Sequence, residues 1–150
     1  MERVTWLPLC VEDVAGEVLS RKIIPFDLVL ARGVVSNGGL QYINSYSRLK
    51  EGTRERMIED LNKAFEIISA MANCLSDKPN ALIVLDTVTD CSCLPFTRSK
   101  LEELGLEVVF SEKSNESGRT IFSAYQKAGI YRQDYQEVFD LVICRKVQSP

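Results

Sequence analysis

The sequence predicts an α+β fold, or a small α/β fold, with a helical N-terminal half and a sheet of about three strands in the C-terminal half. Two observations indicate this class. A continuous apolar stripe at helical spacing runs through residues 54–75, and short apolar runs rich in β-forming residues follow Pro79. Because 150 residues is a usual length for one domain, we expect a single domain over residues 1–150.

Helical spacing of apolar residues predicts further helices before the long one. The first covers residues 11–21, and Pro25 suits the first turn of the second. The apolar face of this second helix carries Phe26, Val29, Leu30 and Gly33. It ends at Asn37-Gly38-Gly39, because Asn and Gly tolerate the left-handed conformation of helix C-caps. A short aromatic helix over residues 40–47 follows, and Thr53 is placed to cap the helix of residues 54–75.

The C-terminal half mixes predicted strands and helices. The predicted strands are residues 81–85, 106–110 and 139–144. Between them we expect a short helix over residues 99–104, a polar loop over residues 111–119 and a helix over residues 120–128. Gly105 and Gly129 end the two helices. The strand, helix, strand order is compatible with a parallel pair.

The composition excludes several classes of function. The chain has 18 basic and 21 acidic residues, a net charge of −3 and no histidine. Lack of histidine removes the Ser-His-Asp and Cys-His nucleophile systems and most zinc and non-haem iron sites. The near-neutral balance gives no basic footprint, so we expect no direct nucleic-acid binding. No residue is predicted to be catalytic, and neither a metal nor another cofactor is expected.

The apolar runs and the cysteines indicate a cytoplasmic protein. No apolar run is long enough to span a membrane, and residues 1–10 lack the basic start and apolar core of a secretory signal. The five cysteines are Cys10, Cys74, Cys91, Cys93 and Cys144. Their odd number and irregular spacing favour free, mostly buried thiols in a reducing compartment.

The first candidate site is the turn at residues 36–39 and the segment after it. Adjacent glycines can cradle a phosphate, but the Lys and Ser/Thr of a phosphate loop are missing, so we interpret the turn as a joint between helices. Tyr and Arg after the turn are usual anchors of protein interfaces, although they also fill ordinary helix packing. The predicted binding residues are Asn37, Gly38, Gly39, Tyr42, Asn44, Tyr46 and Arg48.

An alternative site consists of Asp86 and Asp90, at and after the end of the first predicted strand. Carboxyl ends of strands host active sites in α/β sheets, and carboxylates bind Mg²⁺ or transfer protons. Aspartate near a strand end is also an ordinary turn residue. Both interpretations stay open.

Residues 27–47, followed by the long helix, resemble the bacterial DNA-mimic-protein family, whose small helical domains have an Asn-Gly-Gly turn before an aromatic helix and an Asn-Ser. The matching residues are Asn37, Gly38, Gly39, Tyr42, Asn44 and Ser45. The resemblance covers residues 27–75, about a third of the chain. It implies a helical fold there and binding to a transcription factor through DNA-like charge.

Three functional hypotheses follow, in order of preference. The first is a protein-binding module, an immunity-type protein or other antagonist that blocks a toxin or regulator through the surface near the Asn-Gly-Gly turn. The second is an enzyme, or a nucleotide or metal binder, that uses Asp86 and Asp90. The third is a DNA mimic, which requires carboxylates spaced like phosphates along one face.

Overall fold

Helices and strands alternate through most of the chain, and their arrangement confirms the α+β class. A computed structural model describes residues 9–35, 43–44, 48–49, 53–87, 94, 96–131 and 138–148. The helices in this part are α1 (Val11–Leu19), α2 (Arg54–Cys74), α3 (Arg98–Glu103) and α4 (Glu116–Lys127). The strands are β1 (Leu28–Arg32), β2 (Ile43–Asn44), β3 (Arg48–Leu49), β4 (Leu82–Asp86), β5 (Leu106–Lys113) and β6 (Phe139–Lys146).

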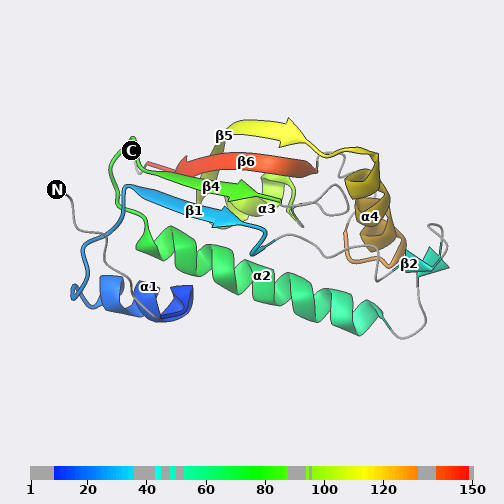
Figure 1. Ribbon diagram of the computed structural model, residues 1–150, viewed down its shortest axis with the longest axis horizontal. Coiled ribbons are helices and arrows are strands. Elements are labelled where there is room, and N and C mark those ends of the chain that lie inside the picture. Colours follow the sequence, from blue (N-terminus) through cyan, green and yellow to red (C-terminus); the bar gives the residue numbers. More distant parts are fainter. Residues whose placement is uncertain are drawn as a thin grey trace.

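The main sheet has four strands in the order β1-β4-β6-β5. β1 and β4 are parallel, whereas β6 runs antiparallel to both of its neighbours, β4 and β5. In Figure 1, α1 and α2 lie below the strands and α4 lies beyond one end of the sheet. The short strands β2 and β3 form a separate antiparallel pair. Because β6 lies between β4 and β5, the first two strands predicted from the sequence are not a neighbouring parallel pair.

The predicted second helix is wrong, because its residues form the edge strand β1. Val29 and Ala31 turn toward the core, whereas Leu28 and Leu30 are exposed. The strand is held by β4. At its start the Leu82 amide donates to the Asp27 carbonyl over 3.0 Å, and after its end the Gly33 amide donates to the Asp86 carbonyl over 2.7 Å. Since both faces of the segment are apolar, its alternation is invisible in a hydrophobicity pattern. That pattern fits helical spacing equally well.

The predicted short aromatic helix is also wrong where the structure describes it. Ile43–Asn44 is the strand β2, paired antiparallel with Arg48–Leu49. The other residues of the predicted segment lie outside the described part of the chain. The long helix is confirmed as α2. Thr53 stands at its N-cap position, but its side chain makes no capping hydrogen bond.

The elements of the C-terminal half are confirmed with different bounds. The predicted loop over residues 111–119 is wrong, since its first residues extend β5 and its last residues begin α4. Asn115 is the N-cap of α4, and its side-chain oxygen accepts a hydrogen bond from the Gly118 amide over 2.9 Å. This cap satisfies one of the free amides at the helix start, so α4 begins earlier than apolar spacing alone predicts.

The helix α2 supplies side chains to three buried clusters, the smallest of which joins its Ala70 and Cys74 to Ala15 of α1. Its C-terminal half, including Ile68 and Met71, packs with the core side of the sheet, represented by Ile83, Leu85 and Val142. Its N-terminal half packs against α4 through Met57, Leu61, Ile121, Phe122 and Tyr125. Among the described helices, none has the length and apolar character that a membrane crossing requires.

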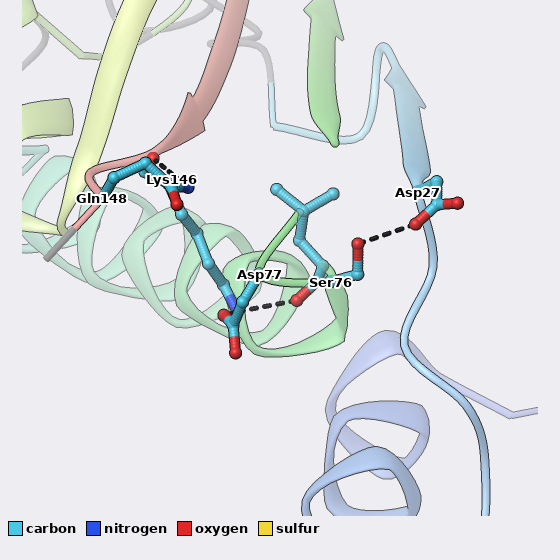
Figure 2. A network of polar contacts seen from close by, with 6 residues as sticks. Asp27, Ser76, Asp77, Lys146 and Gln148 are labelled. Atoms are coloured by element: carbon cyan, nitrogen blue, oxygen red, sulfur yellow. Dashed lines mark hydrogen bonds and ion pairs between the residues drawn. The ribbon is translucent and has the colours of Figure 1, made fainter. Parts of the chain in front are cut away.

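Polar contacts tie the C-terminal end of α2 to two strands of the sheet, β6 and β1 (Figure 2). Lys146 Nζ, from the end of β6, donates to the Leu75 carbonyl over 2.6 Å and to Asp77 Oδ1 over 2.9 Å. Ser76 Oγ donates to Asp27 Oδ1 over 2.7 Å. Because Asp27 directly precedes β1, this network holds the start of β1 and the end of β6 at the C-terminal end of α2.

Candidate functional site

The two faces of the main sheet have different surroundings. Alternate residues of β4 and β6, such as Ile83, Leu85 and Cys144, are fully buried under the helices. The residues between them are only partly buried and belong to none of the buried clusters. In the part of the chain that the structure describes, no helix contributes buried side chains to this second side. We call it the open face.

The open face is apolar across its whole width. Its apolar side chains are Leu28, Leu30, Leu82, Val84, Phe110, Leu141 and Ile143. Leu30 is the cross-strand partner of Val84, Val84 of Ile143, and Ile143 of Phe110. These four residues form one row over all four strands, which we call the apolar row. Its two ends, Leu30 and Phe110, are 66% and 53% exposed.

Two ion pairs flank the apolar row. On one side, Arg32 and its cross-strand partner Asp86 approach to 3.3 Å between Nε and Oδ2. On the other side, Arg145 Nε lies 2.7 Å from Glu107 Oε2. The Arg145 hydrogen bond lowers the pKa of the Glu107 carboxyl, and the same contact raises the pKa of the guanidinium. An apolar centre with a polar border is the usual anatomy of a protein interface.

The two edges of the sheet differ in how they are protected against pairing with another strand. β5 carries register shifts between Val108 and Phe110 and between Glu112 and Lys113. Such bulges and charges discourage a further strand from pairing there. β1 has no such irregularity, because it pairs with β4 in continuous register, so its edge lacks the protection that bulges give. The bulge in β5 has a second effect, because it turns Phe110 onto the open face beside Ile143.

The structure places the first predicted site only in part. Asn37, Gly38, Gly39, Tyr42 and Tyr46 lie outside the described residues. Asn44 and Arg48 are paired to each other across β2 and β3, so the structure brings the backbones of these two together. The role of this surface in binding stays a prediction.

The alternative site is represented by Asp86 alone, since Asp90 lies outside the described residues. The Asp86 carboxylate is engaged by Arg32, and its carbonyl accepts a hydrogen bond from the Gly33 amide over 2.7 Å. An incoming cation would therefore compete with a guanidinium already in place. Among the described residues, no three carboxylate or thiol side chains gather as metal ligands.

A polar cluster that the sequence did not predict links β6 to the start of α4. Asp140 accepts hydrogen bonds from the Ser114 hydroxyl and, over 3.1 Å, from the Asn115 amide. Arg119 donates to the Ser114 carbonyl over 3.2 Å. Ser114 is buried, and all of these groups satisfy one another. The cluster therefore positions α4. The signal that could have found it is an Asn followed by an acidic residue before an apolar run.

The helical side of the molecule carries an acidic groove of about 460 Å³ next to α2. The charged residues along it are Glu12, Glu55, Glu59, Lys63 and Glu66. Glu55, Glu59, Glu66 and Lys63 lie on the same helix, and the lysine interrupts the line of carboxylates.

The described cysteines are free and fall into two environments. Cys74 and Cys144 are buried, as predicted, and desolvation raises the pKa of both thiols, that of Cys144 to about 12. Cys10 is exposed, so the expectation of mainly buried thiols does not extend to it. Its hydrogen bond to Asp13 raises the pKa of its thiol. Cys91 and Cys93 lie outside the described residues.

The comparisons with known proteins leave the site to be interpreted from its own geometry. No protein-family model matches this chain, and no curated protein or solved structure matches it either. The resemblance to the bacterial DNA-mimic-protein family therefore stays a prediction.

Proposed function

We propose that this chain is a protein-binding module whose interface is the open face of the sheet. The observation that carries the proposal is the apolar row, which joins all four strands and is widely exposed at both ends, Leu30 and Phe110. Contiguous apolar patches on a protein surface mark interaction sites. Contact with a partner removes such a patch from water, which is favourable.

The chemistry of the patch supports a protein as its ligand. Phe110 offers an aromatic anchor, and the Arg32–Asp86 and Arg145–Glu107 pairs place charge at the border of the patch rather than at its centre. Aromatic residues and arginine are enriched in interfaces, and charged groups are depleted from their centres. An open sheet face also suits a protein partner better than a small ligand, which prefers a concave pocket.

We extend the proposal to an antagonist or immunity-type role, in which the open face covers a functional surface of a toxin or regulator. A sheet backed by the buried side chains of α2 and α3 presents its surface already ordered. Binding then needs little reorganisation, which favours the tight, competitive contact that blocking requires.

The test compares the open face with a control surface. The tagged full-length chain is used to capture partners from lysate of its source cells, alongside Leu30→Asp/Phe110→Asp. Ile24→Asp is the matched control, since Ile24 is a more exposed apolar residue that lies outside the sheet. We expect a specific partner to be retained by the wild type and the control and lost from the double variant. A partner that the double variant retains contradicts the proposal.

A Tyr42→Ala/Tyr46→Ala variant tests the surface that the sequence predicted near the Asn-Gly-Gly turn. If this variant alone loses the partner, the binding surface lies at the turn and not on the open face. If it binds like the wild type while Leu30→Asp/Phe110→Asp does not, the open face is the interface.

A further inference from the structure

The charges of the open face are balanced within the face. Arg32 is paired with Asp86 and Arg145 with Glu107. Glu112 is exposed, and among the described ion pairs it belongs to none. A face with strong net charge would repel an identical face, whereas this one has a single unbalanced carboxylate. Charge therefore does not oppose contact between two copies.

The positions of Arg32 and Glu112 make the face complementary to itself. Arg32 pairs with Asp86, Asp86 with Leu141, and Leu141 with Glu112, so the guanidinium and the carboxylate stand at opposite ends of one row. The apolar row next to it likewise ends in Leu30 on β1 and Phe110 on β5. A second face turned over so that β1 meets β5 would bring these unlike ends together.

We propose that in the free protein the open face is occupied by a second copy of this chain, packed face to face with aligned strands. The inference rests on the proposed function, and a toxin or regulator that binds the open face would compete with the second copy. A two-fold axis parallel to the strands, between Val84 and Ile143, sets Leu30 over the partner copy's Phe110. The same axis sets Arg32 opposite the partner copy's Glu112. The interface is isologous, so each contact occurs twice, and aligned packing is a common arrangement of two sheets.

The other symmetric arrangement is disfavoured by charge. An axis perpendicular to the strands would keep β5 over β5 and reverse its direction. Glu112 would then meet the partner copy's Glu107, which places like charges together at the border of the interface. The axis parallel to the strands avoids this contact and is the one we assign.

The size of the face predicts a weak dimer. Four strands at about 4.8 Å spacing and about six residues of each give a plan area of roughly 400 Å². Stable interfaces bury about 800 Å² per partner, so the dimer falls in the weaker class. We expect dissociation constants in the micromolar range, on the order of 10–100 µM.

The experiment is sedimentation equilibrium of the full-length chain from about 5 to about 500 µM, a range that brackets the expected dissociation constant. The variants are Arg32→Glu and Glu112→Arg, each alone and as an equimolar mixture. Each variant alone places like charges at both contacts, and we expect its dissociation constant to rise by about tenfold or more. In the mixture every contact joins opposite charges again, so dimer mass should return. The recovery also shows that both variants are folded.

The inference is overturned by a wild type that stays monomeric throughout, by a dimer that neither variant weakens, or by a mixture that does not recover. A monomeric wild type that still binds another protein through Leu30 and Phe110 overturns only the second copy as partner and leaves the proposed function standing. A dimer that responds to the charge variants, while Leu30→Asp/Phe110→Asp leaves it intact, also overturns the face-to-face arrangement.

Discussion

Lys146, the last residue of β6, donates a hydrogen bond over 2.6 Å to the carbonyl of Leu75, the C-cap residue of α2. Carbonyls at helix C-termini lack intrahelical partners, and a cation there also interacts favourably with the helix dipole. The contact joins the longest described helix to a central strand, and Asp27 is tied to the same corner through Ser76.

Lys146→Met removes this cap and should lower the free energy of unfolding by about 1–2 kcal/mol, because the Leu75 carbonyl loses a charged donor. Urea denaturation measures the change. Lys22→Met is the control, since Lys22 makes only an exposed ion pair with Glu17 and its loss should cost about 0–1 kcal/mol. Equal losses in the two variants would contradict a capping role.

Asn115→Ala should destabilise the protein by about 1 kcal/mol, because the Gly118 amide loses its side-chain acceptor. Cys10→Ala is the comparison. Cys10 occupies the N-cap position of α1 without a capping hydrogen bond, so this change should have little effect on unfolding. If Cys10→Ala costs as much as Asn115→Ala, the cap of α4 does not account for the loss.

We expect Asp27 to cause part of the loss of stability of the fold in acid. Its hydrogen bonds from Lys78 and Ser76 lower the pKa of the carboxyl in the folded state. A lowered folded-state pKa means that the stabilisation is complete above the unfolded-state pKa, about 3.9, and is lost as pH falls through the folded-state value. In Asp27→Asn, stability should therefore decline less steeply below about pH 5 than in the wild type. Thermal unfolding midpoints measured from pH 7 to pH 2.5 provide the test, and parallel curves would contradict it.

The fold could be predicted wherever the length and composition of an apolar run decide between helix and strand. The long one-sided stripe of α2 predicted a helix, and the short runs of β4 and β6, rich in β-forming residues, predicted strands. The prediction of β1 failed because Leu28 and Leu30 are apolar although they are exposed. The alternation that reveals a strand needs one polar face, and β1 has none.

The candidate site could not be predicted from the sequence either, because strand pairing alone brings its residues together. Leu30, Val84, Ile143 and Phe110 are far apart in the sequence and meet only through the pairing of four strands. Pairing order is a long-range property, and the insertion of β6 between β4 and β5 has no local signal. An exposed apolar residue also looks like a core residue in the sequence, so a binding face of this kind is mistaken for part of the core.

The thiols should react in an order that follows burial. With iodoacetamide at pH 8 and peptide mass mapping, we expect Cys10 to be labelled while Cys74 and Cys144 stay protected until urea unfolds the chain. Because the pKa of Cys10 is raised by Asp13, its labelling should accelerate further between pH 8 and pH 9.5. Labelling of Cys144 under native conditions at the rate of Cys10 would contradict the burial of β6.

Leu85 and Leu30 belong to opposite faces of neighbouring strands, so they separate packing from binding. Leu85 is fully buried, and Leu85→Ala should lower the free energy of unfolding by about 2–5 kcal/mol through lost burial and the cavity left behind. Leu30→Ala should change it by less than about 0.5 kcal/mol, because the side chain is already largely in water. Both are measured by urea denaturation at low micromolar protein, where association adds little to apparent stability.

Raising the protein concentration then distinguishes the two variants a second time. If the open face joins two copies, the wild type and Leu85→Ala should both gain apparent stability at high concentration, whereas Leu30→Ala should gain less. A loss from Leu30→Ala comparable to that from Leu85→Ala at low concentration would mean that Leu30 stabilises the monomer itself. Its apolar side chain would then be explained by folding, and the open face would need no partner.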